Sequence, residues 1–129
     1  MLDHIGISAS DYRKSRAFYV DALMPLGIDI VMEVTREETG GYEGVGFGTD
    51  RKPWFWIGAD GKPGGGTTHI AFAADSRAAV DRFYAAAIAA GGRDNGPPGL
   101  RTDYHPDYYA AFVLDPDGNN VEAVCHAPA

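Results

Sequence analysis

The fold is decided by the stretch Phe112-Val-Leu-Asp-Pro-Asp-Gly-Asn-Asn-Val-Glu-Ala-Val124. Within it, Asp115-Pro-Asp-Gly118 is a strong turn signal, because proline fixes one backbone angle and glycine accepts a positive φ. Apolar residues flank this turn on both sides, so the stretch predicts a hairpin that joins two strands. The second strand carries one carboxylate, Glu122, among apolar neighbours. Such an acid needs a partner, because a buried unpaired charge is very costly.

Composition indicates one compact globular domain with an acidic net charge. The chain has 129 residues, of which 45% are apolar and 12% aromatic, as in globular proteins. Eleven basic against eighteen acidic residues give a net charge of −7 with no basic stripe. This balance argues against general binding to nucleic acids or to anionic membranes.

Targeting signals are not evident in the sequence. The first residues, Met-Leu-Asp-His, lack the basic head and apolar run of a signal peptide. No stretch approaches the roughly 20 apolar residues of a membrane helix. The single cysteine, Cys125, fits a reducing compartment and an inert place in the core. We therefore expect a cytoplasmic protein.

The first half of the chain predicts a strand, a helix and three further strands. Alternation predicts a strand over 2–9, and Ser10 or Asp11 then caps a helix that Gly27 ends. The remaining elements are a strand over 28–34, a loop over 35–44, and short strands near 44–49 and 53–58.

The second half repeats this order after a flexible connector that begins at Gly64. A strand starts at His69, Asp75 or Ser76 caps a second helix, a long loop covers 93–107, and the hairpin closes the chain. We therefore predict an α+β fold of two tandem βαβββ modules, residues 1–63 and 67–129, within a single domain.

One spacing relates the two halves. Matching residues lie 65 positions apart, and the register runs on to the last strands. The pairs are His4 and His69, Phe18 and Phe83, Tyr19 and Tyr84, Gly27 and Gly92, Phe47 and Phe112, and Asp50 and Asp115. Two copies at so long a period indicate a duplicated module rather than a solenoid. The alternative is a chance coincidence of two similar units.

The duplication brings three possible metal ligands together. If the modules pack about a pseudo-twofold axis, His4 and His69 occupy equivalent positions and can face each other. Alternation puts Val121, Ala123 and Cys125 on the helix side of the last strand, and Glu122 on the open face. Two imidazoles and one carboxylate form a typical set for Fe(II), and also suit Zn, Mn or Ni. The alternative is two core histidines with an acid at the rim.

The loop before the hairpin supplies candidates for substrate binding. Arg101 could clamp a carboxylate or phosphate, and Tyr104 and Tyr109 carry polar tips that suit either a pocket or simple packing. If the 65-residue register holds, Phe55 and Ile57 also lie on the open face of the sheet.

With these residues in place, the chain resembles the vicinal oxygen chelate superfamily, which includes glyoxalase I, bleomycin-resistance proteins and extradiol dioxygenases. The matching stretches are His4-Ile-Gly-Ile, Phe18-Tyr19, Leu26-Gly27, His69-Ile-Ala-Phe and Asp115-Pro-Asp-Gly-Asn-Asn-Val-Glu122. The resemblance implies an open, cupped sheet, with metal ligands that map onto His4, His69 and Glu122.

The resemblance also implies a function, with one departure. Glyoxalase I carries a fourth ligand, a glutamate on the last strand of the first module, where the 65-residue register gives Ile57. We therefore expect a metal-dependent enzyme that chelates adjacent oxygens of a small substrate, of the glyoxalase or dioxygenase type. The alternative is a metal-free protein that sequesters a small molecule, as bleomycin-resistance proteins do. The resemblance also favours a homodimer.

Overall fold

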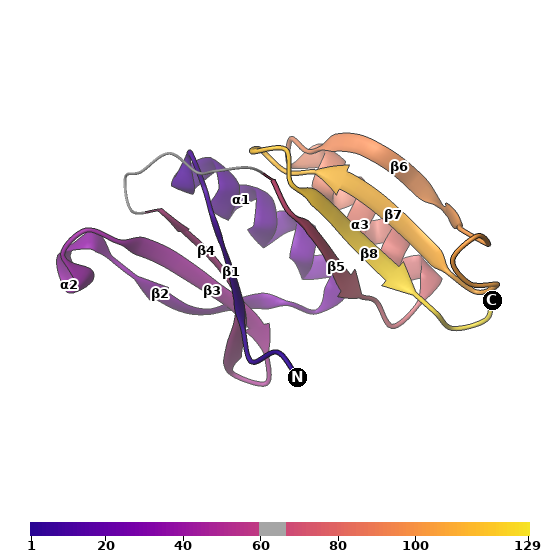
Figure 1. Ribbon diagram of the computed structural model, residues 1–129, viewed down its shortest axis with the longest axis horizontal. Coiled ribbons are helices and arrows are strands. Elements are labelled where there is room, and N and C mark those ends of the chain that lie inside the picture. Colours follow the sequence, from indigo (N-terminus) through magenta and orange to yellow (C-terminus); the bar gives the residue numbers. More distant parts are fainter. Residues whose placement is uncertain (60–66) are drawn as a thin grey trace.

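The computed structural model describes residues 1–59 and 67–129. The first half contains one strand, one long helix and three further strands in chain order (Figure 1). The elements are β1 (Ile5–Ser8), α1 (Tyr12–Leu23), the short 3-10 helix η1 (Met24–Leu26), β2 (Asp29–Val34), the single turn α2 (Arg36–Thr39), β3 (Glu43–Thr49) and β4 (Lys52–Ala59). The connector predicted from Gly64 begins outside the described residues.

The second half follows the same order of strand, helix and three strands. Its elements are β5 (His69–Ala73), α3 (Arg77–Ala89), β6 (Arg93–Leu100), β7 (Tyr109–Leu114) and β8 (Asn120–Cys125). The helices begin where the sequence predicts, because Asp11 caps α1 and Ser76 caps α3 through side-chain oxygens that accept backbone N–H groups.

The described residues form two four-stranded mixed sheets, ordered β1-β4-β3-β2 and β5-β8-β7-β6. In each sheet the first strand runs parallel to the last, and the other pairs are antiparallel. Figure 1 shows the sheets side by side, with α1 and α3 behind them. The predicted α+β fold is therefore confirmed, and the helix-free faces of both sheets are turned to the same side.

The core lies between the sheets and the two helices. Tyr19 of α1 is fully buried, and its ring packs edge-on against Phe18 and Phe55. In β8, Val121, Ala123 and Cys125 are buried on the helix side, as alternation predicts. These faces supply the apolar burial that holds each helix to its sheet.

The prediction of a long loop over 93–107 was wrong for its first half, because residues 93–100 form β6. Pro97 and Pro98 lack the N–H of a ladder, which favoured a loop. They are tolerated because β6 is an edge strand, and its pairing with β7 is irregular on either side of Gly96.

The spacing between the modules also changes along the chain. The capping residues Asp11 and Ser76 are 65 positions apart, as predicted. The helix-ending glycines with positive φ are Gly27 (φ 75°) and Gly91 (φ 99°), and these are 64 positions apart. Gly92, which the sequence pairs with Gly27, lies one residue past the turn.

In the last strands the spacing is 66. Gly6 of β1 lies opposite Trp56, and its counterpart Ala71 of β5 lies opposite Glu122. Trp56 is therefore the structural equivalent of Glu122, in place of Ile57. The conclusion that this position carries no carboxylate in the first module still holds.

The same shift separates Phe47 from Phe112. Phe47 is fully buried opposite Phe55, and the residue in that position of the second module is Val113, opposite Val121. Phe112 instead lies opposite Glu122 and shares the open face with it. A shift of one residue reverses which face a strand residue occupies, so the 65-residue register was wrong here.

The turn of the closing hairpin ties the two modules together. The hydroxyl of Tyr19, on α1, donates a hydrogen bond of 2.5 Å to Asp115 in that turn. Asp115 is buried and also accepts from the backbone N–H groups of Asp117 and Asn119 and from the Asn119 side chain. Burial, and then the nearby Asp115 carboxylate, raise the pKa of Tyr19, so the hydroxyl keeps its proton.

A second contact joins the turn to the start of α1. Asp117 accepts hydrogen bonds from the backbone N–H of Ser10, at 3.2 Å, and from the Ser10 hydroxyl. The Ser15 hydroxyl lies 3.5 Å from the same carboxylate. The turn therefore fixes how the second sheet sits against α1.

Within the described residues, no helix is long and apolar enough to cross a membrane.

The contact between Tyr19 and Asp115 generates the first prediction. Tyr19→Phe should lower the free energy of unfolding by about 1–3 kcal/mol, because a buried carboxylate loses a hydrogen-bond donor. The matched control is Tyr84→Phe, which alters the repeat counterpart and should cost less than about 0.5 kcal/mol. Urea unfolding of the three proteins measures both values. Equal effects of the two substitutions would contradict the proposed link between the modules.

Candidate functional site

The site is built on β8, which places Glu122 on the open face of the second sheet. The Glu122 side chain is 1% exposed, and its Oε1 lies 2.7 Å from Nε2 of His69 on the neighbouring strand β5. The His69 side chain is 56% exposed. A buried carboxylate thus meets an imidazole that solvent can reach.

Tyr108, just before β7, holds the other oxygen of this carboxylate. Its hydroxyl donates a hydrogen bond to Glu122 Oε2. Partial burial, and then the Glu122 carboxylate, raise the pKa of Tyr108 to about 12. Tyr108 therefore remains a neutral donor at physiological pH.

Aromatic and basic side chains surround Tyr108. Its ring packs edge-on against those of Tyr104 and His126, and His126 also contacts His105. The backbone N–H of Arg101 donates a hydrogen bond of 2.7 Å to the Tyr108 carbonyl. The loop between β6 and β7 and the segment after β8 together make one wall of the site.

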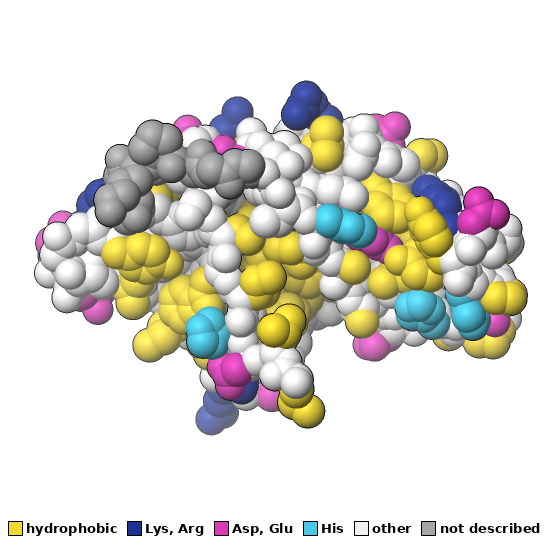
Figure 2. All heavy atoms as spheres, viewed as in Figure 1, with side chains coloured by type: hydrophobic (Ala, Val, Ile, Leu, Met, Phe, Trp, Pro, Cys, Tyr) yellow, Lys and Arg dark blue, Asp and Glu magenta, His cyan; other side chains and the backbone are white. Residues whose placement is uncertain are grey.

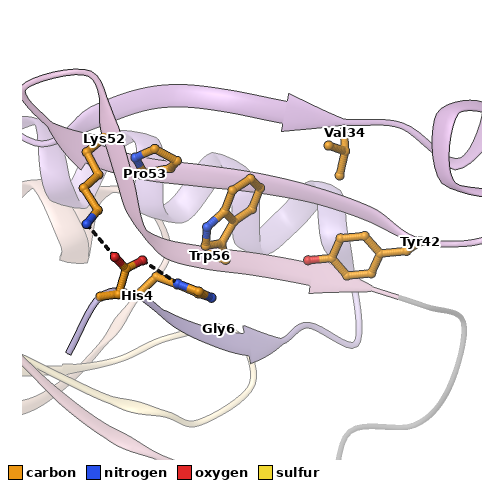
Figure 3. Close-up of a pocket in the computed structure, with 8 residues that line it drawn as sticks. His4, Gly6, Val34, Tyr42, Lys52, Pro53 and Trp56 are labelled. Atoms are coloured by element: carbon orange, nitrogen blue, oxygen red, sulfur yellow. Dashed lines mark hydrogen bonds and ion pairs between the residues drawn. The ribbon is translucent and has the colours of Figure 1, made fainter.

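His4 lies on the open face of the first sheet (Figure 3). Its Nδ1 is 2.8 Å from Asp3, whose other oxygen accepts a hydrogen bond of 2.7 Å from Lys52. These contacts, with Lys52 first and His4 second, lower the pKa of Asp3. A carboxylate that holds Nδ1 fixes the ring and leaves Nε2 for another partner, as in many metal sites.

The structure does not gather the three predicted ligands in one chain. His4 and His69 both line a groove of about 420 Å³ between β1 and β5. Across residues 1–59 and 67–129, however, no group of three His, Cys, Asp or Glu side chains is placed to hold a metal ion. Figure 2 shows one histidine side chain beside an acidic side chain near the middle of this face.

The predicted substrate-binding residues divide into two groups. Arg101 and Tyr104 lie near Glu122: the Arg101 guanidinium sits 5.4 Å from the centre of the Phe112 ring, and Tyr104 packs on Tyr108. Arg101 also donates a hydrogen bond of 2.6 Å to the Pro97 carbonyl.

The other three do not share the open face with Glu122, although Phe55 lines the groove between β1 and β5. Tyr109 donates a hydrogen bond of 2.6 Å to Asp81 of α3, on the helix side. Phe55 and Ile57 are fully buried in the core. Their placement follows from the 66-residue spacing, which turns both toward α1.

Two residues of the open faces, Tyr108 and Trp56, are not among the substrate-binding residues that the sequence predicts. Alternation along β7 could have separated Tyr108 from Tyr109, because neighbouring residues of a strand point to opposite faces. Trp56 shares the parity of Gly6 and Gly58, which face the open side, but the shift in register concealed its equivalence to Glu122.

The pair of His69 and Glu122 fits two positions of a metal site. Ligand atoms about 2.0–2.2 Å from one ion lie roughly 3 Å apart when they are neighbours. The observed 2.7 Å between Nε2 and Oε1 needs only a slight opening. An imidazole and a carboxylate are also donors that Fe(II), Zn, Mn and Ni accept. Among the described residues, no third ligand side chain lies beside this pair.

Comparison with known proteins then decides the family. A model of the Glyoxalase/Bleomycin resistance protein/Dioxygenase superfamily matches residues 1–123. The chain belongs to this superfamily. A glyoxalase/bleomycin resistance protein from Albidiferax ferrireducens T118 is 31% identical, and the match covers 99% of each chain with a TM-score of 0.73.

Two further matches are narrower. Glyoxalase I from Zea mays is 19% identical, with a TM-score of 0.70; the match covers 95% of this chain and 43% of the maize chain, and shows the fold alone. Uncharacterized protein YwkD of Bacillus subtilis (strain 168) is 48% identical over 42 residues, which are 33% of this chain and 30% of that protein. Superfamily membership thus agrees with the two βαβββ units of the fold.

The hydrogen bond from Tyr108 generates the second prediction. In the unfolded chain a tyrosine has a pKa near 10. Because the pKa of Tyr108 is higher in the folded protein, its protonated hydroxyl contributes to the stability of the fold. This contribution is complete below pH 10 and is lost as the pH rises toward 12. Subtracting the tyrosinate absorbance of Tyr108→Phe from that of the parent should isolate one phenol with a midpoint near pH 12. A midpoint near 10 would show that Glu122 does not hold this hydroxyl.

Proposed function

We propose that this protein is a divalent-metal enzyme that acts on a small molecule with adjacent oxygens. The observation that carries the proposal is the buried Glu122 carboxylate 2.7 Å from the exposed His69 imidazole, on the open face. His69 and Glu122 would hold the ion, and His4 would be the third ligand. A bound divalent ion supplies Lewis-acid stabilisation of negative charge on substrate oxygens.

The chain's own residues have further roles in this proposal. Tyr108 keeps its proton at neutral pH and orients Glu122 by donating to Oε2. Arg101 lies over Phe112, beside this carboxylate, where its guanidinium can pair with an anionic group of the substrate.

We propose that the third ligand comes from a second copy of the chain. Both helix-free faces are turned to the same side in Figure 1, so they lie side by side rather than opposed. A site enclosed by a first-module face and a second-module face therefore needs another copy laid over this one. A symmetric dimer would form two such sites, each with His4 from one copy and His69 and Glu122 from the other.

Metal dependence gives the third prediction. One of Fe(II), Zn(II), Mn(II) and Ni(II) should raise the melting temperature of the parent protein, because a ligand that binds only the folded state stabilises it. Glu122→Gln keeps the shape and removes the charge, and should abolish the rise. The control Glu33→Gln alters an exposed acid that pairs with Arg16 and should leave the rise intact. An unchanged parent melting temperature with every metal would contradict the proposal.

Mixing of variants tests the shared site, as the fourth prediction. His4→Ala and Glu122→Ala should each bind little metal alone. Unfolded and refolded together in equal amounts, they should recover about a quarter of the parent metal content, because half the dimers are mixed and each mixed dimer keeps one intact site. Metal bound per chain is measured by elemental analysis. If the refolded mixture is dimeric but recovers no bound metal, either all three ligands come from one chain or the proposed metal site does not exist.

The second candidate is a metal-free protein that binds a small molecule. One observation favours it: within the described residues, Glu122 already has hydrogen-bond partners on both oxygens, and no three-ligand group is assembled. In that case the metals would not change the melting temperature of the parent or of Glu122→Gln. Glu122 would then affect only the affinity for the small molecule. The melting experiment above therefore separates the two candidates.

The position of Trp56 bears on the type of reaction. Because Trp56 stands where a fourth carboxylate would stand, the proposed site has three protein ligands. We propose that activity on the hemithioacetal of methylglyoxal and glutathione is weak or absent, and that dioxygenase-type chemistry is the alternative. Robust turnover of the hemithioacetal would show that a fourth ligand has been missed.

A further inference from the structure

The open face of the first sheet carries a second groove, whose lining includes His4 but not His69 or Glu122. It has a volume of about 710 Å³. Figure 3 shows the rings of Trp56 and Tyr42 spread over β3 and β4 on the side away from α1. The lining residues are Asp3, His4, Gly6, Val34, Tyr42, Lys52, Pro53 and Trp56.

Glycines make room for these rings. A Cβ added to Gly46 would lie 2.9 Å from atoms of the Trp56 ring, and one added to Gly44 would lie 2.6 Å from the Tyr42 hydroxyl. Both distances are shorter than real Cβ contacts, so a side chain at either glycine would displace the ring that lies over it. The Trp56 and Tyr42 rings therefore lie over glycine positions of β3 and form an aromatic floor of the groove.

The groove has a charged end beside this floor. Lys52 donates a hydrogen bond of 2.7 Å to Asp3. An ammonium group has three hydrogens, and Asp3 accepts only one of them. Lys52 therefore retains hydrogen-bonding capacity for an anion in the groove.

We propose that this groove binds a flat aromatic ring that carries a carboxylate or similar anionic group. The ring stacks on Trp56 and Tyr42, and the anion lies at Lys52. Trp56 occupies the position that holds Glu122 in the second module, so this face presents an aromatic surface where the other presents a carboxylate. Assigning this ring to the substrate rests on the proposed function, whereas the binding itself does not.

Calorimetric titration with 2-naphthoate tests the inference on metal-free protein. The parent should bind, and Trp56→Leu should weaken binding about tenfold through loss of the stacked ring. Trp56→Phe keeps an aromatic ring and should recover most of the affinity, which excludes a general loss of folding. Cyclohexanecarboxylate has the charge without the flat ring and should bind at least tenfold more weakly than naphthoate.

Charge substitutions in the same groove should act in opposite directions. Lys52→Met removes the cation and should weaken naphthoate binding several-fold. Asp3→Asn removes the competing carboxylate and should strengthen it. Neutral 2-naphthalenemethanol should respond to neither change.

Three outcomes overturn the inference: no naphthoate binding, equal binding of cyclohexanecarboxylate, or unchanged affinity in Trp56→Leu. Each is independent of metal. Naphthoate binding without any effect of metal on the melting temperature would reject the proposed enzyme and keep the groove. A rise in melting temperature with metal, but no naphthoate binding, would keep the proposed enzyme and reject the aromatic groove.

Discussion

The hydrogen bonds from α1 to the turn at 115–118 are the constraint on which the site depends. Tyr19 reaches from the first module into the second, and its hydroxyl meets a buried carboxylate that no cation neutralises among the described residues. Ser10 binds Asp117 in the same turn. With these contacts in place, α1 and α3 pack behind the sheets, and both open faces look the same way. The arrangement explains why His4 and Glu122 sit on neighbouring rather than facing surfaces.

A shift of one residue has large consequences on these faces. The modules keep their 65-residue spacing through the first strand and the helix cap, but the last strands are 66 apart. Because side chains alternate along a strand, a shift of one residue exchanges the residues on the helix side with those on the open face. It buries Ile57 and puts Trp56 opposite Gly6, where the second module has Glu122. The two faces therefore carry different chemistry on the same backbone plan.

Much of the fold could be predicted from local signals. The caps at Asp11 and Ser76, the alternation of the first strands and the Asp-Pro-Asp-Gly turn are short-range features that act through their own backbone. The strand β6 was not predicted, because its two prolines disfavour a strand. They are tolerated because β6 lies at the edge of its sheet.

The candidate site was less predictable, because it depends on tertiary register. The contact between His69 and Glu122 follows from the parallel pairing of β5 with β8. Tyr108 and Tyr109 are adjacent in sequence, but their side chains lie on opposite sides of the sheet, and only the alternation along the strand distinguishes them. The distance of His4 from the other two could not be read from the sequence, since it is set by how whole modules pack.

The most direct test is anomalous diffraction from a crystal of the metal-loaded protein. We expect one strong peak per chain, between His69 and Glu122 of one copy and His4 of the other. Ligand distances of about 2.0–2.3 Å would identify all three as ligands. A peak held by three ligands of one chain, or no peak near Glu122, would contradict the proposed shared site.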